Sequence, residues 1–254
     1  LLSIGDESGE ATYIDNARCS YKRTLCDITS LPVGSADKSL PVRILEIGSY
    51  LGVVSGSLAK MGYSVTALDI PEFMNNERLR DRYCREGVSV IAANLRDYMI
   101  PADPESFDIV IMCETLEHMN FNPLPVLSEI NRVLIRGGYL YISLPNLSSL
   151  VNRVKLLLGC SIHNPVTDFA AQLSKERNMI VGIHWREYTG NELRELVAMG
   201  GFTVRRHYFF TAHRPSLPAR LLYLLFPLFR QNQTLIASKE SSPAMDFHLT
   251  DASR

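Results

Sequence analysis

The chain has 254 residues, a formal net charge of −1 and 46% hydrophobic residues. This length suits one domain with a sizeable core, and the balanced charge argues against a protein that binds nucleic acid through overall basicity. The five cysteines are odd in number and form no C-x-x-C pair, so neither a disulfide framework nor a cysteine zinc site is predicted. We expect a cytoplasmic protein with reduced thiols.

The sequence divides into segments of different character. Residues 1–40 are polar and irregular, and we expect an N-terminal cap of one or two short helices that ends in a linker. Alternating strand and helix patterns then predict one domain over 41–239. Residues 147–183 interrupt the expected order of elements, which indicates a lid insertion. Residues 240–254 are polar and are predicted to be a flexible tail.

The most informative segment is 43–52, which reads RILEIGSYLG. An apolar strand runs into a turn bounded by Gly48 and Gly52, a spacing that differs from the dinucleotide fingerprint G-x-G-x-x-G. A second strand at 64–68 ends on Asp69. Glycine permits a tight turn and close approach of a ligand to the backbone, and an acid at the end of the second strand accepts hydrogen bonds from a ribose diol. The segment therefore predicts a nucleoside-containing cofactor.

Further strands and helices follow at the spacing of a parallel sheet. Residues 107–113 (FDIVIMC) form a continuous apolar run, typical of a strand buried on both faces. A helix is predicted at 125–136, ended by Gly137 and Gly138, and a strand at 139–144. The other predicted elements are helices at 73–86, 150–158 and 189–199, the last opened by a capping box, and strands at 89–92, 202–210 and 234–238.

The pattern E-x-G-x-x-x-G with its downstream acid resembles motif I of the class I S-adenosylmethionine-dependent methyltransferases. Over about 41–239 the order and spacing of motifs resemble the ubiquinone-biosynthesis-type branch. The Leu-Pro-Asn-Leu turn at 144–147, the helix with Asn152 and Arg153, and the Leu- and Pro-rich C-terminal part resemble bacterial enzymes that modify surface glycans, lipid-linked sugars or secondary metabolites. The resemblance implies a single doubly wound, mostly parallel α/β sheet of about seven strands, with helices on both faces and the last strand antiparallel. It implies S-adenosylmethionine as methyl donor. The cofactor-binding residues would be Glu46, Gly48, Ser49, Gly52, Asp69, Ile70, Asn94, Leu95 and Cys113.

Several of these cofactor residues have a structural alternative. Glu46 could orient the loop that accepts the ammonium group of the cofactor, or it could only cap the turn. Asn94 could hydrogen-bond to an adenine edge, since an amide both donates and accepts, or it could be a turn-forming asparagine. Asp97 is a rival of Asn94 for the same role. Cys113 could equally be a small core residue.

A second constellation follows the strand at 107–113, where Glu-Thr-Leu-Glu-His occupies 114–118. Ligands bind at the carboxyl edge of open α/β sheets, and two carboxylates with an imidazole can hold a divalent cation. Together with a distant histidine, the pattern E-x-x-E-H resembles the small-RNA 3′-end 2′-O-methyltransferases and the ubiquinone-pathway O-methyltransferases, both metal-assisted. The ligands that this resemblance implies are Glu114, Glu117, His118 and His184.

The same pattern also resembles methyltransferases that use no metal. We therefore favour His118 as a metal-free general base, with His184 and Glu114 as further catalytic candidates, and keep the divalent cation as the alternative. Four more residues could contact the acceptor: Asn146, His163, Trp185 and Tyr188. The alternatives are a turn amide for Asn146, an ordinary surface histidine for His163, and packing of the lid for the two aromatic residues.

The stretch 196–238 contains no acid but has five arginines among leucines and phenylalanines. This composition indicates peripheral contact with the inner membrane face or with a lipid-linked anionic substrate. A helix that covers the sheet edge, or a homodimer interface, is the alternative. The apolar run 221–229 is interrupted by Pro227 and is too short to span a bilayer. Dense basic clusters with stacking motifs are lacking, so a nucleic-acid partner is not expected.

The sequence thus predicts transfer of a methyl group from S-adenosylmethionine, most simply to an oxygen of a small molecule or of a lipid-linked or glycan sugar. A quinone or phenol is the nearest alternative acceptor, and the 2′-oxygen of an RNA 3′ end is the third. The alternative to an enzyme is a module that binds the cofactor but has no catalytic activity. The intact Gly48, Gly52 and Asp69 beside His118 argue against that alternative.

Overall fold

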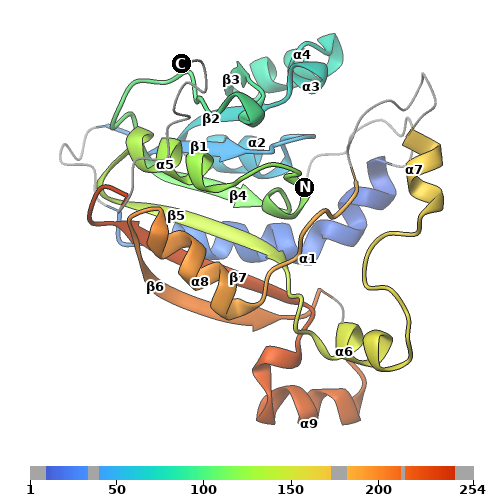
Figure 1. Ribbon diagram of the computed structural model, residues 1–254. Coiled ribbons are helices and arrows are strands. Elements are labelled where there is room, and N and C mark those ends of the chain that lie inside the picture. Colours follow the sequence, from blue (N-terminus) through green and yellow to red (C-terminus); the bar gives the residue numbers. More distant parts are fainter. Residues whose placement is uncertain (1–9, 34–39, 173–181, 213–214, 244–254) are drawn as a thin grey trace, which may run out of the picture.

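The computed structural model describes residues 10–33, 40–172, 182–212 and 215–243. Seven strands form one sheet in the order β3-β2-β1-β4-β5-β7-β6 (Figure 1). Strands β1 to β5 pair in parallel, whereas β7 runs antiparallel to both of its neighbours. The predicted doubly wound, mostly parallel fold is therefore confirmed. The strands are β1 (Arg43–Ile47), β2 (Ser64–Asp69), β3 (Ser89–Ala92), β4 (Phe107–Cys113), β5 (Leu134–Pro145), β6 (Phe202–Phe210) and β7 (Asn232–Lys239).

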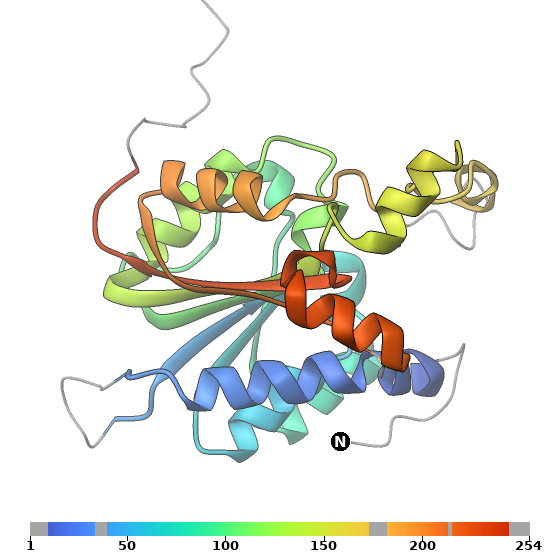
Figure 2. The same cartoon turned by 90° about the horizontal axis from the view of Figure 1, so that it is seen from below.

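Helices cover both faces of the sheet (Figure 2). Successive strand residues point to opposite faces, so Leu45 and Ile47 of β1 belong to one buried cluster and Ile44 to the other. The first cluster packs under α5 and α8, and the second packs under α1, α2, α3 and α4. These helices are α1 (Glu10–Thr29), α2 (Val53–Lys60), α3 (Pro71–Met74), α4 (Glu77–Arg85), α5 (Leu124–Val133) and α8 (Gly190–Met199).

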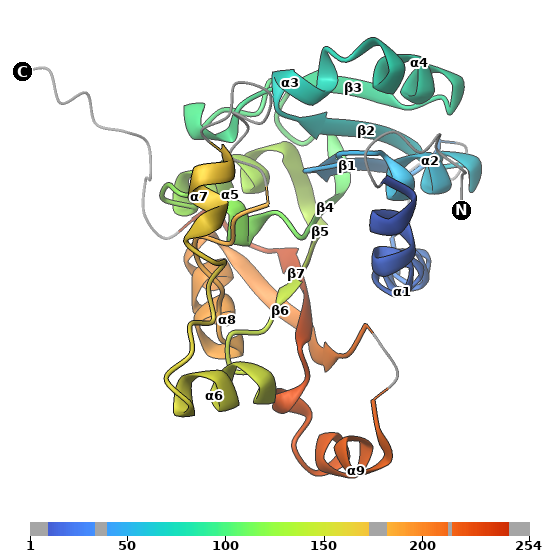
Figure 3. The ribbon, with the colours of Figure 1, turned by 90° about the vertical axis from the view of Figure 1, so that its right-hand side faces the viewer.

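Three further helices lie outside this layered core: α6 (Leu150–Leu157), α7 (Thr167–Gln172) and α9 (Leu217–Leu225) (Figures 1 and 3). Helices α6 and α7 belong to the predicted insertion at 147–183, of which 173–181 lies outside the described residues. Short 3₁₀ turns are η1 (Leu95–Asp97), η2 (Leu116–His118) and η3 (Pro227–Phe229). Within the described part of the chain, none of the helices combines the length and apolarity needed to cross a membrane.

Some predicted boundaries were wrong. The N-terminal cap is one 20-residue helix, α1, because Ile14 and Ile28 are buried against the sheet. The helix predicted at 73–86 is broken, since the side chain of Asn76 accepts a hydrogen bond from the Leu79 amide and starts a new helix, α4. The helix predicted to reach residue 136 ends at Val133, and β5 begins at Leu134.

Of the predictions on the later part of the chain, the helix start at Thr189 agrees with the structure and the start of the tail does not. The capping box of α8 is confirmed, with Thr189 and Glu192 hydrogen-bonded reciprocally. The tail predicted as flexible begins with residues that contact the domain, because the carbonyl of Ser241 accepts a hydrogen bond from Asn131. Residues 244–254 of that tail lie outside the described residues.

Candidate active site

The loop between β1 and α2 is held tightly against the protein itself. Gly48 and Gly52 have φ of 72° and 64°, the left-handed region that favours glycine. A Cβ on Gly48 would lie 2.2 Å from Thr115 Oγ1, and one on Gly52 would lie 2.3 Å from the ring of Tyr83. The two glycines therefore make room for protein side chains, a role that adds to the predicted approach of a ligand.

Tyr83 of α4 fastens this loop, and sequence reasoning missed it. Its hydroxyl donates to the carbonyl of Tyr50 at 2.9 Å and shares a second hydrogen bond with Ser49 Oγ at 2.9 Å. The signal that could have identified it is its place as the one aromatic residue of a highly charged helix. The predicted cofactor residue Ser49 thus helps to fix the loop conformation.

Two carboxylates flank the loop. Asp69, at the end of β2, is 9% exposed and accepts hydrogen bonds from the amides of Tyr50 (2.7 Å) and Ile70 (2.8 Å). Burial raises its pKa, and these two amides counteract the rise. Glu46 lies buried on β1 and accepts a hydrogen bond from the hydroxyl of Ser55, while burial raises its pKa to about 7. Both acids are thus positioned beside the loop as predicted.

The third-strand residues and Cys113 have packing or turn roles in the structure. Asn94 is exposed, and its Oδ1 accepts the amide of Arg96 at 3.0 Å, which is the turn-forming alternative. Leu95 packs against the core beneath it, and Asp97 is exposed on the same turn. The thiol of Cys113 lies 3.6 Å from Thr24 Oγ1, and burial raises its pKa well above the ordinary value.

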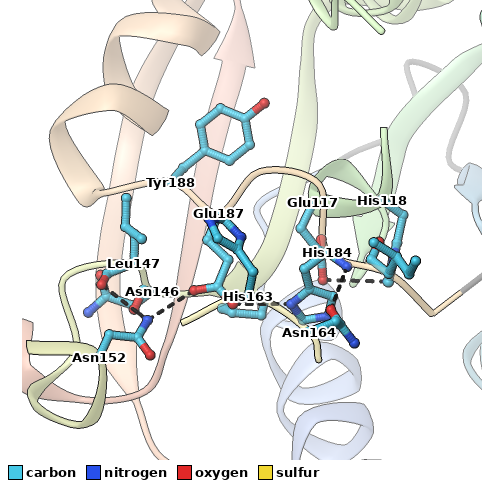
Figure 4. Close-up of polar contacts among 12 residues, drawn as sticks. Glu117, His118, Asn146, Leu147, Asn152, His163, Asn164, His184, Glu187 and Tyr188 are labelled. Carbon is cyan, nitrogen blue, oxygen red and sulfur yellow. Dashed lines mark hydrogen bonds and ion pairs between the residues drawn. The ribbon is translucent and has the colours of Figure 1, made fainter. Parts of the chain in front are cut away.

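A polar cluster forms at the carboxyl end of β4. Glu117 and His118 lie on η2, and His184 reaches them from the segment before α8, so residues 66 positions apart meet as the resemblance implied (Figure 4). Each of the three offers a ligand atom within 4.8 Å of the others. The two imidazole rings are 4.9 Å apart. Glu114 precedes η2 with a left-handed φ of 48°.

Hydrogen bonds fix the tautomer of both histidines. His118 Nδ1 lies 2.8 Å from the carbonyl oxygen of Ile183, and His184 Nδ1 lies 3.1 Å from a carboxylate oxygen of Glu187. Both partners are acceptors, so each Nδ1 carries the proton and each Nε2 keeps its lone pair. Glu187 in turn accepts a hydrogen bond from Asn152 of α6 at 3.0 Å. This support of His184 was not predicted, although Glu187 follows His184 by only three residues.

The carboxylate of Glu117 has no hydrogen-bond donor among the described residues, although it is fully buried. His118 Nε2 lies 4.0 Å from Glu117 Oε1. Burial and the neighbouring Glu114 raise the pKa of Glu117 well above its ordinary value. Glu114 is accessible to solvent, yet surrounding protein raises its pKa to about 7. The carboxylate of Glu117 and the imidazole nitrogens of His118 and His184 are close enough to one another to hold a divalent cation, whereas the predicted fourth ligand, Glu114, does not belong to this close group.

The remaining predicted acceptor residues lie in different surroundings. Asn146 is buried, and its Nδ2 donates to the carbonyls of Leu228 (2.7 Å) and Arg230 (2.8 Å), so it is a structural amide that holds η3 to the end of β5. His163 is exposed in the loop before α7. Trp185 is 38% exposed and its ring faces Phe169, whereas Tyr188 is buried in the core.

Part of this chain is similar in sequence to known methyltransferases. Residues 45–142 match the family described as a methyltransferase domain. The ubiquinone biosynthesis O-methyltransferase of Xanthomonas campestris pv. campestris (strain B100) is 32% identical over 114 residues, which are 44% of this chain and 47% of that protein. Residues 45–142, less than half of the chain, thus resemble a methyltransferase domain, and the sheet has the architecture of the solved methyltransferase described below. It spans about half the length of the curated relatives it matches first.

Solved structures extend the likeness of this methyltransferase domain to nearly the whole chain. A SAM dependent methyltransferase from Archaeoglobus fulgidus is similar over 92% of this chain and 100% of that chain, with a TM-score of 0.59 and 18% identity. The cyclase SpnF is similar over 87% of this chain and 81% of that chain, with a TM-score of 0.57 and 16% identity. The same fold therefore serves more than one chemistry, and the activity must be argued from the site.

Proposed function

We propose that this protein transfers a methyl group from S-adenosylmethionine to a hydroxyl oxygen of a small or lipid-linked acceptor. The observation that supports it is a contact between two parts of the site. One is the loop between β1 and α2, residues 48–52, which we call the cofactor loop; the other is the polar cluster of Glu114, Glu117, His118 and His184. Thr115, next to Glu114, donates a hydrogen bond to the carbonyl of Ile47 at 3.3 Å and packs against Gly48. Cofactor and acceptor groups would thus meet at one edge of the sheet.

When bound, S-adenosylmethionine supplies an electrophilic methyl group. The work of this chain is to hold that methyl group in line with the acceptor oxygen, which is the main source of rate in such transfers. Asp69, at the end of β2, would accept the ribose hydroxyls, and the loop from Gly48 to Gly52 would approach the rest of the cofactor. Tyr83 keeps that loop in position.

An aliphatic or sugar hydroxyl must also lose a proton. We propose that Glu114, Glu117, His118 and His184 would hold a divalent cation, which would supply positive charge that lowers the pKa of the acceptor hydroxyl, so that its proton can pass to solvent water. Two observations support this proposal. The carboxylate of Glu117 receives no hydrogen bond from the described residues. In both histidines Nδ1 is hydrogen-bonded, which leaves the lone pair of Nε2 available to a metal ion. The mixed oxygen and nitrogen donors suit Mg²⁺, Mn²⁺ or Co²⁺.

His118 as a metal-free base is the second candidate mechanism. Burial lowers the pKa of His118, so its imidazole is neutral near pH 7 and can accept a proton at Nε2. This mechanism leaves the buried charge of Glu117 without a partner, unless the carboxyl stays protonated. For that reason we now prefer the cation.

The acceptor is proposed by class. A sugar or aliphatic hydroxyl requires the activation that the polar cluster can provide, which favours it over a phenol. A quinol or phenol is the second class, because relatives over the domain are named ubiquinone biosynthesis O-methyltransferases. The 2′-hydroxyl of an RNA 3′ end is the third.

The test begins with native mass spectrometry of the protein purified without added cofactor, where we expect bound S-adenosylmethionine or S-adenosylhomocysteine. Release of S-adenosylhomocysteine is then measured with sugar-hydroxyl, catechol and RNA 3′-end acceptors, with chelator and with Mn²⁺. Turnover that chelation abolishes and Mn²⁺ restores supports the cation. Turnover that survives chelation and falls at low pH supports His118 as base. Cofactor binding without turnover on any acceptor would favour the silent module.

A further inference from the structure

Helix α9 presents an apolar stripe to solvent. Leu217, Leu221, Leu224 and Leu225 are each between 66% and 75% exposed. Their spacing of four, seven and eight residues from Leu217 places them on one face of a helix. Tyr223 is the buried residue of α9, so the helix rests on the domain by a small part of its surface. A stripe of this kind on an amphipathic helix needs an apolar partner.

Helix α6 presents a similar face. Val154 is 45% exposed, and Leu157 and Leu158 are 85% and 72% exposed. Figures 1 and 3 show α6 and α9 as the lowest elements of the molecule, beyond the same end of the sheet. We call these exposed apolar side chains of α6 and α9 the apolar end surface. Both helices thus lie toward the same end of the molecule, with α9 extending further than α6.

The charges around the apolar end surface are positive. The sequences of α6, α9 and η3 contain no acid. Lys155 and Arg220 are exposed and have no side-chain partner in the described part of the chain, and Arg153 lies over the ring of Phe229 at 5.2 Å. Cations around exposed leucines are the composition that binds anionic lipid surfaces.

Other arginines of this region serve the fold. Arg206 pairs with Asp27 at 3.3 Å, Arg230 donates to the carbonyl of Phe209 at 2.8 Å, and Arg205 pairs with Glu240. Arg214 lies outside the described residues. The apolar contribution to binding should therefore exceed the electrostatic one, and the dependence on salt should be moderate.

We propose that the apolar end surface docks on an anionic lipid bilayer. A second copy of the chain fits this surface less well, because a twofold interface apposes identical patches and would bring cations against cations. A bilayer instead offers apolar depth for the leucines and anionic headgroups for Lys155 and Arg220. No helix needs to cross the membrane for this contact.

The docking surface is connected to the candidate active site. Asn152, on α6, donates to Glu187, which holds His184. If the proposed methyl transfer holds, the acceptor would be collected from the lipid surface at this end of the domain. The docking itself does not depend on that activity, so it is tested by binding alone.

The test is co-sedimentation with vesicles of phosphatidylcholine, with and without one third phosphatidylglycerol. We expect binding to the anionic vesicles at least tenfold tighter than to the neutral ones. Leu221→Ser with Leu225→Ser should weaken anionic-vesicle binding at least tenfold. The matched control, Met61→Ser with Met99→Ser, removes side chains that are 55% and 59% exposed elsewhere and should bind as the unchanged protein does.

Two outcomes would overturn the proposal. One is that the unchanged protein fails to bind anionic vesicles at low salt. The other is a dimer in sedimentation velocity that the leucine variant abolishes, which would assign the surface to a second copy. Affinity for S-adenosylhomocysteine should be equal in all variants, so a loss of cofactor binding in the unchanged protein would count against the proposed function and leave the docking result readable.

Discussion

The carboxylate of Glu117 is fully buried and receives no hydrogen bond from the described residues. Burying a charge without a partner is costly, and here Glu114 adds a second carboxyl beside it. The metal-free site is thus destabilising in itself, as expected where function outweighs stability. A cation that binds these groups in the folded protein would neutralise the buried charge and stabilise the fold.

Glu117→Gln should therefore stabilise the metal-free protein. The isosteric amide removes the buried charge, a gain of about 1–3 kcal/mol, or about 2–4 °C in Tm for each kcal/mol. In Mn²⁺ the order should reverse, because the unchanged protein gains stability by binding the ion and the variant does not. Differential scanning fluorimetry in chelator and in Mn²⁺ measures both. Equal Tm values for the two proteins in both conditions would rule out the cation site.

The same pair predicts a pH dependence. Burial raises the folded-state pKa of Glu114 from 4.5 to about 7, and burial together with the neighbouring Glu114 raises that of Glu117 well above its ordinary value. A raised carboxyl pKa stabilises the folded protein fully below the unfolded value, and this contribution is lost as the pH rises through the folded value. In chelator, the advantage of Glu117→Gln should thus grow between pH 6 and pH 8. An advantage that shrinks over this range would contradict the assignment.

Asp69 governs cofactor affinity in this account. Asp69→Ala removes the acceptor that is placed for the ribose diol, and we expect a loss of about 1.5–3 kcal/mol in binding of S-adenosylhomocysteine. Titration calorimetry measures it. Asp81→Ala is the matched control, since Asp81 is an exposed acid on α4. If Asp69→Ala and Asp81→Ala bind S-adenosylhomocysteine equally well, Asp69 has no part in the cofactor site.

At the scale of elements, the segment that carries His184 is tied to η2 and to α6. The amide of Trp185 donates to the carbonyl of Glu117 at 2.8 Å, and Asn152 donates to Glu187 at 3.0 Å. A histidine ligand depends on the group that holds its other ring nitrogen. The position of α6 is therefore coupled to the geometry of His184.

Asn152→Ala should weaken Mn²⁺ binding by about 10–100-fold, the usual effect of losing support behind a metal ligand. Affinity for S-adenosylhomocysteine should not change, because Asn152 is remote from the loop at Gly48. Calorimetry with each ligand separates the two effects. Asn75→Ala, at an exposed asparagine between α3 and α4, is the control. A parallel loss of both affinities would indicate general damage to the domain.

Elements with a strong local signal were predictable, and those set by tertiary contacts were not. The run Phe107–Cys113 is apolar throughout and became the central strand β4. Residues 134–138 are compatible with either a helix end or a strand, and pairing of Leu134 with Phe107 decides for the strand. Position 138 of that strand is a glycine because a Cβ there would be 2.9 Å from the carbonyl oxygen of Asp108. No local pattern contains that contact.

The site was predictable to the same degree. The fingerprint around Gly48 and the E-x-x-E-H pattern identified two groups that meet at one sheet edge, and His184 was placed with them by resemblance. Tyr83 and Asn152 were missed because each acts through a contact that only the folded chain creates. Asn146 was left open and proved to be structural, since its amide is occupied by the backbone of η3 and Arg230.

At the scale of the whole molecule, α1 joins the start of the chain to its last strands. Asp27 accepts hydrogen bonds from the hydroxyls of Tyr208 and Tyr141 and from Arg206. The same helix carries Tyr13, whose ring lies edge-on to Tyr50 in the cofactor loop at 5.4 Å. The antiparallel edge of the sheet thus positions a helix that reaches the cofactor loop.

Asp27→Ala should therefore lower both stability and cofactor affinity. It leaves two tyrosine hydroxyls and a guanidinium without their shared acceptor, at a cost of about 2–3 kcal/mol. Because α1 would then dock less firmly, Tyr13 would support Tyr50 less well, and we expect binding of S-adenosylhomocysteine to weaken by roughly tenfold, equivalent to about 1.4 kcal/mol. Thermal unfolding and calorimetry measure the two effects.

The control for this prediction lies on the same helix. Asp15 is 65% exposed and pairs with Arg18 at the surface, where an ion pair contributes little, so Asp15→Ala should change neither quantity. If Asp27→Ala lowers the Tm but leaves cofactor affinity intact, then α1 only braces the sheet. If both variants weaken binding equally, the effect belongs to the charge of α1, and the docking through Asp27 is not what positions Tyr13.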